Sequence, residues 1–170
     1  MEIVINDTNI LIDLHNAGLL PYCKLLGLDF RTLDVILNEI EQEDQKASVR
    51  CIVDDGFLSV HSLTDRQVLK VYKKVREYNG VCNLSPEDIS VMVYAQDLDC
   101  RLLTGDKVLR VKAANENIKV SGILYLTDMM VGRGVVSNSQ MIAALQRLLE
   151  SNSRLPKRLI NERIVMLKEQ

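Results

Sequence analysis

Four acidic residues stand at positions that a parallel β-sheet could bring together: Asp7, Glu39, Asp88 and Asp106. Asp7 follows the apolar run of residues 3–6, which we expect to form a buried strand. Asp106 follows a second such run, residues 101–104. The carboxyl ends of parallel strands lie at the same edge of a sheet, and open α/β proteins bind their ligands at that edge. The spacing therefore predicts that both carboxylates border one site.

The other two acids lie in segments that we expect to be helical. Residues 32–40 carry apolar side chains spaced for one helix face, with Thr32 as the N-cap, and Glu39 stands at the boundary of that face. Ser85 and Asp88, with a proline between them, are typical of a helix start. The helix beyond Asp88 is almost entirely apolar, so we expect its first turn to lie near the core.

A cluster of carboxylates predicts the binding of a hard divalent cation. Mg²⁺ and Mn²⁺ prefer oxygen ligands, and like charges at close range raise one another's pKa when no cation neutralises them. A bound metal ion activates water and stabilises the charge that develops on a phosphate. This chemistry requires neither cysteine nor histidine. His15 and His61 are isolated in the sequence, and we expect both to be structural or surface residues.

Each acid also has a purely structural explanation. Asp7 and Asp106 each precede a predicted helix and could cap it, and Asp88 could form a capping box with Ser85. Glu39 could be an ordinary exposed glutamate on a helix. The convergence of all four positions favours a shared site over four separate explanations.

Four further polar residues complete the candidate site. Asn9 and Thr104 are expected to support Asp7. Lys107 and Arg110 could contact a phosphate of the substrate, or they could be surface charges.

An alternation of strands and helices must position these residues. Strands are expected at residues 3–6, 30–32, 58–60, 101–104 and 119–120. Helices are expected at residues 9–15, 21–27, 32–40, 49–53, 64–79, 85–95, 107–111, 122–130, 139–150 and 155–168. The alternation predicts an α/β fold with three layers, in which helices cover both faces of a central, mainly parallel sheet of about four to five short strands. We expect residues 1–136 to form the main domain and residues 137–170 to form a helical extension packed on it. Asp97 and Asp99 precede a strand, so we expect them at the opposite edge of the sheet.

The composition is that of one globular domain of 170 residues, with 47% hydrophobic and 26% charged residues. The net charge of −2 gives no overall basic field, and the absence of tryptophan disfavours an aromatic platform for nucleic acid bases. The four cysteines are widely spaced, which favours reduced thiols in a cytoplasmic protein. We expect neither a membrane span nor a signal peptide.

Four segments resemble, in order and spacing, the motifs of the PIN domain family: residues 7–13 (DTNILID), 35–40 (VILNEI), 84–88 (LSPED) and 102–106 (LLTGD). Residues 120–124, residues 133–137 and the closing helix resemble a prokaryotic subgroup of toxin-like PIN proteins. The resemblance spans almost the whole chain. One departure is the last motif, in which Gly105 and Lys107 flank a single Asp106 where two neighbouring acids are common.

The resemblance implies a PIN-like α/β/α fold and a metal-dependent endoribonuclease that acts on single-stranded or structured RNA. The ligands of Mg²⁺ or Mn²⁺ would be Asp7, Glu39, Asp88 and Asp106, and the pocket would be supported by Asn9 and Thr104. It also implies a toxin that a small antitoxin neutralises, and a homodimer.

Two alternatives belong to other functional classes. A PIN scaffold without catalytic activity would bind RNA or a protein, and the single acid in the last motif motivates this hypothesis. A phosphohydrolase of the haloacid-dehalogenase type would use Asp7 as its nucleophile. Such enzymes usually carry a second aspartate two residues further on, where this sequence has Asn9.

Overall fold

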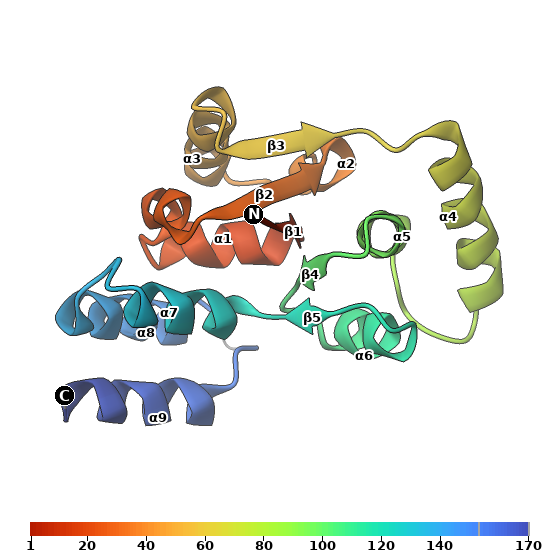
Figure 1. Cartoon of the computed structure of the whole chain (residues 1–170). Helices are drawn as coiled ribbons and strands as arrows, with labels where there is room; N and C mark the ends of the chain where they lie inside the picture. Colours follow the sequence, from red (N-terminus) through yellow and green to blue (C-terminus); the bar gives the residue numbers. More distant parts are fainter. Residues whose placement is uncertain (153, 170) are drawn as a thin grey trace.

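Five parallel strands form the centre of the protein in a computed structural model that describes residues 1–152 and 154–169. The strands are β1 (Glu2–Asn6), β2 (Leu28–Leu33), β3 (Leu58–His61), β4 (Arg101–Leu103) and β5 (Val120–Ser121). Their order in the sheet is β3-β2-β1-β4-β5, and every neighbouring pair is parallel (Figure 1). The predicted α/β class with a parallel sheet of about five short strands is confirmed.

Helices form the connections between the strands and the part of the chain that follows β5. They are α1 (Thr8–Asn16), the 3-10 helix η1 (Leu20–Leu26), α2 (Asp34–Leu37), α3 (Glu43–Asp54), α4 (Asp65–Tyr78), α5 (Pro86–Asp97), α6 (Lys107–Asn115), α7 (Ile123–Gly132), α8 (Asn138–Ser151) and α9 (Lys157–Lys168). Capping boxes start α4, α5 and α8, with Thr64, Ser85 and Ser137 as the N-caps, and the predicted helix start at Ser85 is confirmed. Ser153, in the predicted break between the last two helices, lies outside the described residues.

Alternating side chains of the strands pack into two separate hydrophobic cores. Val4 of β1 belongs to a cluster with residues of α1, η1, α3 and α7–α9, whereas its neighbour Ile5 packs with residues of α2 and α4–α6. Successive side chains of a strand point to opposite faces of the sheet, so the two clusters are the two helical layers. Figure 1 shows α1 and α7–α9 on one side of the strands and α4–α6 on the other. The three-layer arrangement is confirmed.

The order of the strands places a topological switch point beside β1. The chain moves outward from β1 through β2 to β3, and then returns to the other side of β1 to form β4 and β5. The connections at the carboxyl ends of β1 and β4 therefore diverge, which is the position where open α/β sheets bind ligands. Asp7 directly follows β1, and residues 104–106 directly follow β4.

The predicted helix over residues 32–40 is wrong in its extent. β2 continues to Leu33, which pairs with His61 of β3, and α2 has only four residues. Thr32 is not an N-cap: it is buried within β2, and its hydroxyl donates to the carbonyl of Asn6 at 2.8 Å. Glu39 consequently lies in a turn after α2. A short apolar run is compatible with either a buried strand or a helix. Residues 32–33 form a strand here because β2 pairs with both β1 and β3.

The two C-terminal helices pack on the layer that contains α1. Arg147 of α8 donates from Nε and Nη2 to the carbonyl of Ala17, at 3.1 and 2.6 Å. Asn152 donates to the buried carboxylate of Asp13 at 2.9 Å. In the described part of the chain, no helix is both long and apolar enough to cross a membrane.

Candidate metal-binding site

Asp7 is buried at the end of β1, with 3% of its surface exposed. Its backbone N–H donates to the carbonyl of Leu103 at 3.0 Å, which fixes it against the end of β4. Its Oδ1 accepts from the N–H of Thr8 at 2.8 Å and thereby caps α1. Its Oδ2 accepts from Asn9 Nδ2 and from Thr104 Oγ1, both at 2.6 Å. The cap thus uses one oxygen, and two side chains orient the other.

Thr104 links the ends of three strands. It is completely buried, and its N–H donates to the carbonyl of Ser121 in β5 at 2.9 Å. Its hydroxyl donates to Asp7 and accepts from the N–H of Asp106 at 3.0 Å. One hydroxyl group therefore sets the position of one acid and of the backbone that carries another.

Asn9 explains why the residue between Thr104 and Asp106 is a glycine. Asn9 Oδ1 accepts from the N–H of Gly105 at 2.5 Å, while its Nδ2 donates to Asp7. A Cβ atom at position 105 would lie 3.0 Å from Asn9 Oδ1, closer than most real contacts of a Cβ. The side chain of Asn9 thus occupies the space that a second acid at position 105 would need.

Thr8 connects Glu39 to the start of α1. The Thr8 hydroxyl donates to the Glu39 carboxylate, and it also lies 3.2 Å from the carbonyl of Ile36. The sequence interpretation did not assign Thr8 a function, and its position directly after Asp7 is the signal that could have indicated one. The exposed turn that carries Glu39 is therefore tied to the same helix start that Asp7 caps.

Asp88 and Asp106 are both N-terminal residues of helices, as their structural explanation predicts. Asp88 Oδ2 accepts from the N–H of Ser85 at 2.8 Å, and the Asp88 N–H donates to Ser85 Oγ at 3.0 Å. Asp106 Oδ1 accepts from the N–H of Leu109 at 2.7 Å. Each cap uses one carboxylate oxygen, so capping and a role in a shared site are compatible.

The pKa values of Asp7 and Asp88 are raised, and other candidate acids contribute to each rise. Burial raises the pKa of Asp7 from 3.8 to about 6, and the negative charges of Asp88 and Glu39 add to this rise. Burial also raises the pKa of Asp88, with a smaller contribution from Asp106. Among the residues that the structure describes, none of the four acids forms an ion pair with a Lys, Arg or His. No described basic side chain therefore neutralises these carboxylates by an ion pair.

The donor set fits a hard divalent cation. All candidate ligands are carboxylate oxygens, and an added cation would supply the positive charge that this edge lacks. Within residues 1–152 and 154–169, no three Asp, Glu, His or Cys side chains already stand close enough to hold one ion together. Mg²⁺ commonly binds through one or two carboxylates and keeps several waters, so this arrangement remains suitable for it.

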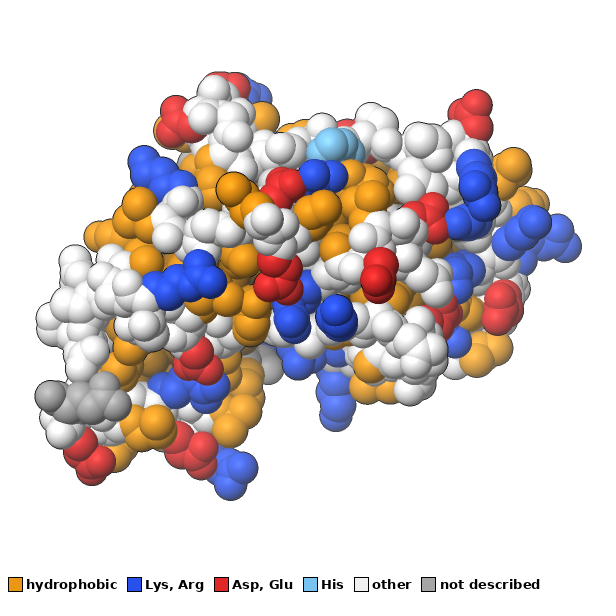
Figure 2. Space-filling model, in the orientation of Figure 1, with side chains coloured by type: hydrophobic (Ala, Val, Ile, Leu, Met, Phe, Trp, Pro, Cys, Tyr) orange, Lys and Arg blue, Asp and Glu red, His pale blue; other side chains and the backbone are white. Residues whose placement is uncertain are grey.

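Basic residues at this edge are few. Lys107 is exposed at the first position of α6, and Arg110, also exposed, donates from Nη1 to the carbonyl of Thr104 at 3.3 Å. On the face that Figure 2 shows, basic side chains gather in groups below the centre and at the right, with acidic and hydrophobic side chains between the groups.

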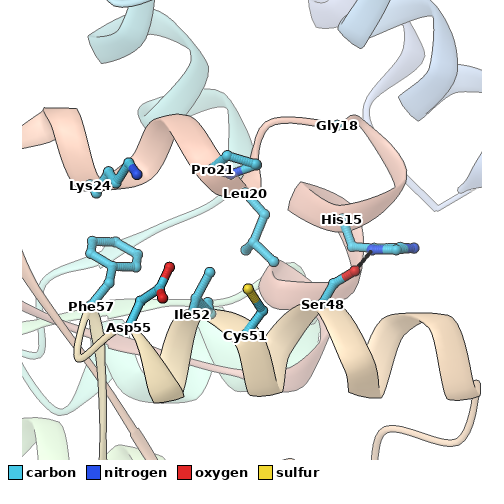
Figure 3. A pocket seen from close by; sticks show the side chains of 10 residues that line it. All are labelled: His15, Gly18, Leu20, Pro21, Lys24, Ser48, Cys51, Ile52, Asp55 and Phe57. Atoms are coloured by element: carbon cyan, nitrogen blue, oxygen red, sulfur yellow. Dashed lines mark hydrogen bonds between the residues drawn. The ribbon is translucent and has the colours of Figure 1, made fainter.

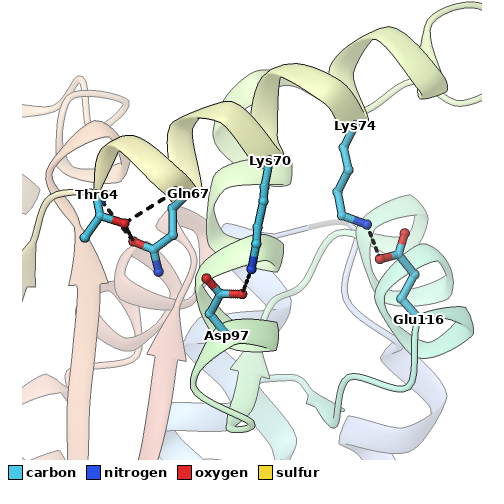
Figure 4. Close-up of polar contacts among 6 residues, drawn as sticks. All are labelled: Thr64, Gln67, Lys70, Lys74, Asp97 and Glu116. Atoms are coloured by element: carbon cyan, nitrogen blue, oxygen red, sulfur yellow. Dashed lines mark hydrogen bonds and ion pairs between the residues drawn. The ribbon is translucent and has the colours of Figure 1, made fainter.

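Two other acids lie away from the site, as expected. Asp97 at the end of α5 pairs with Lys70 of α4, and Asp99 occupies a tight turn with a φ of 46° just before β4. Figure 4 shows that Lys70 and Lys74 both point from α4 to carboxylates, those of Asp97 and Glu116. These two lysines therefore hold α4 against α5 and α6.

A separate groove of about 340 Å³ lies at the other end of α1, between η1 and α3 (Figure 3). Its walls are mainly apolar, with Leu20 and Ile52 facing each other, and the hydrogen bond from His15 to Ser48 at one end. None of the four acids lines it. The groove is therefore distinct from the acidic edge.

Both the sequence and the fold of this chain match those of known proteins. Residues 3–169 match the profile of a family described as PIN domain. Among solved structures, the chain is similar to VapBC2 from Rickettsia felis. That crystal structure contains VapBC2 bound to a DNA fragment from the VapBC2 promoter. The match has 15% sequence identity and a TM-score of 0.51, and it covers 71% of this chain and 98% of the other. At this identity the likeness shows the fold alone. No curated protein matches the sequence.

Proposed function

This chain belongs to the PIN domain family, and from that premise we propose that it is a metal-dependent endoribonuclease that hydrolyses single-stranded RNA. The observation that carries the proposal is the carboxylate of Asp7. It is buried at the carboxyl end of β1 in a parallel sheet, and burial together with the charges of Asp88 and Glu39 raises its pKa to about 6. A buried, perturbed carboxylate without a described cationic partner favours a functional site.

The residues that would hold Mg²⁺ or Mn²⁺ are Asp7, Glu39, Asp88 and Asp106. When bound, the ion would make a water molecule more acidic and would stabilise the charge that develops on the scissile phosphate. Asn9 and Thr104 orient Asp7 by donating to its Oδ2. Lys107 and Arg110 would contact the phosphates that flank the cleaved bond.

Cleavage of a fluorescent single-stranded RNA tests the proposal. We expect activity with Mg²⁺ or Mn²⁺, and EDTA should abolish it. Asp7→Asn and Asp88→Asn should each lower the rate by about 100-fold or more, because each removes a charged ligand while preserving the shape of the side chain.

The matched control is Asp97→Asn, which makes the same chemical change in an acid that pairs with Lys70 at the opposite edge. This variant should keep wild-type activity. Undiminished cleavage in EDTA, or full activity of Asp7→Asn, would contradict the proposal. A duplex of the same sequence, offered in parallel, tests the preference for single strands.

We further propose that the protein is the toxin of a toxin–antitoxin pair in the cytoplasm and that it forms a homodimer. The proposal of a toxin is supported by the resemblance to toxin-like PIN proteins and by the fold shared with VapBC2. Expression of the chain should arrest growth, and co-expression of the small protein encoded beside it should restore growth. Growth arrest that persists in Asp7→Asn would show that toxicity does not come from cleavage.

A non-catalytic scaffold that binds RNA or a protein is the second candidate. The single acid in the last motif favours it, since Asn9 fills the space beside Gly105. Tight RNA binding without turnover in Mg²⁺ and Mn²⁺ would support this alternative over the nuclease.

A further inference from the structure

We propose that Arg110 and Gly122 are positioning residues that hold the acidic edge in place through the carbonyl of Thr104. Arg110 lies one turn after Asp106 on α6, and its Nη1 donates to this carbonyl at 3.3 Å. Thr104 in turn donates to Asp7 and accepts from the N–H of Asp106. The bond from Arg110 therefore secures the residue on which the geometry of two acids depends.

Gly122 makes room for this guanidinium group. It is the N-cap of α7, and a Cβ atom at this position would lie 2.6 Å from Arg110 Nη1. The same atom would lie 3.6 Å from the Thr104 carbonyl oxygen, which is an ordinary contact. The φ of Gly122 is −116°, which any residue adopts. A side chain at position 122 would therefore force the end of the Arg110 side chain to shift, whereas the backbone of Gly122 sets no such restriction.

This role is additional to the contact with substrate phosphate proposed above, and the two roles predict different kinetic effects. A phosphate contact needs only a positive charge at the surface, and its loss weakens RNA binding and raises KM. A positioning role also needs a glycine at position 122, and loss of the bond from Arg110 would move the acids themselves. Loss of this bond should therefore lower kcat, and it should weaken the binding of Mn²⁺ even in the absence of RNA.

Two single variants break the contact from opposite sides. Arg110→Ala removes the donor, and Gly122→Ala displaces it without any change of charge. We expect each to lower kcat and to raise the Kd for Mn²⁺ by on the order of tenfold, because small displacements of catalytic groups are costly. The double variant should be no worse than either single one, since both changes break the same contact. The matched control is Gly132→Ala in α7, where no atom lies within 4 Å of the added Cβ.

Amide hydrogen exchange provides a readout that does not depend on nuclease activity. The N–H of Asp106 is bonded to Thr104 Oγ1, so it should exchange faster in Arg110→Ala and in Gly122→Ala, and by equal factors. Additive losses in the double variant, or unchanged exchange at Asp106, would overturn the inference. The positioning role of Arg110 and Gly122 rests on the proposed function only for its kinetic readouts. If the wild-type protein cleaves no RNA, the nuclease proposal is refuted, and amide exchange at Asp106 still tests the positioning role. A rise in KM alone, with kcat and Mn²⁺ affinity unchanged, would assign Arg110 to phosphate binding instead.

Discussion

The carboxylate of Asp7 combines a structural and a chemical role because its two oxygens face different partners. Oδ1 caps α1, and Oδ2 is held by Asn9 and Thr104. Burial is the largest cause of its raised pKa, and the charge of Asp88 adds to it. A capping aspartate has no need for such an environment, since caps at the surface work equally well. The burial of Asp7 therefore favours a functional role in addition to the cap.

The pH dependence of stability should reveal this carboxylate. A pKa near 6 in the folded protein, against 3.8 for an ordinary aspartate, means that folding favours the protonated form. The stabilising contribution is full below about pH 4 and is lost as the pH rises through about 6. In EDTA, the free energy of unfolding of Asp7→Asn relative to wild type should rise by about 2 kcal/mol between pH 4 and pH 7. Denaturant titrations at a series of pH values measure it, and a flat difference would show that Asp7 titrates normally.

Replacement of Thr104 tests the hydroxyl that joins two acids. Thr104→Val keeps the shape but leaves Asp7 Oδ2 without one donor and the N–H of Asp106 without its acceptor. We expect a loss of about 1–3 kcal/mol in stability and a strong loss of RNA cleavage. Thr104→Ser retains the hydroxyl and serves as the control. Equal cleavage by the two variants would contradict this role.

Among the structural elements, three helices begin at the candidate site, and an acid helps to fix each start. Asp7 caps α1, Asp88 lies in the capping box of α5, and Asp106 caps α6. The N-terminus of a helix carries a partial positive charge. Three helix starts at one edge thus offset part of the repulsion between the carboxylates, and they orient the acids at the same time.

The capping boxes of α4 and α5 provide a matched pair of variants. Ser85→Ala and Thr64→Ala each remove one cap and should each cost about 1 kcal/mol of stability. Only Ser85 holds a candidate site acid, Asp88. Ser85→Ala should therefore also lower RNA cleavage several-fold, whereas Thr64→Ala should not, as α4 starts at a cap formed with Gln67 (Figure 4). Thermal unfolding and initial rates distinguish the two effects, and equal rates would show that the cap does not position Asp88.

At the scale of the whole molecule, the C-terminal helices share a core with the sheet. Ile160 and Ile164 of α9 belong to the same apolar cluster as Val4 of β1, and α9 lies outside α8 in Figure 1. The match to the VapBC2 structure covers 71% of this chain. The boundary near residue 136 remains a prediction, and the shared cluster favours one cooperative unit.

Unfolding of Ile160→Ala tests that cooperativity. Ile160 is completely buried, so the substitution should cost about 2–5 kcal/mol. If the extension is part of one domain, the protein will unfold in a single transition at a lower Tm, and calorimetry will give equal van't Hoff and calorimetric enthalpies. A separate early transition, with the main one unchanged, would show an independent extension. Exposed Val165→Ala is the control and should leave the Tm almost unchanged.

Local signals in the sequence determined much of this structure. The three capping boxes, the alternation of strands and helices and the acids at the strand ends are visible in the sequence because each depends on residues only a few positions apart. The order of the four acid motifs likewise pointed to the family, which the profile match confirmed.

Tertiary structure alone decided the remaining features. Whether residues 32–33 form a strand depended on pairing with β1 and β3, which short-range propensity does not encode. The bonds from Thr8 to Glu39 and from Gly105 to Asn9 join residues 31 and 96 positions apart, and the approach of Arg110 to Gly122 depends on how α6 and α7 leave the sheet. The sequence thus specified which carboxylates are available. The parallel pairing of β1 with β4 set the strand ends that precede Asp7 and Asp106 side by side.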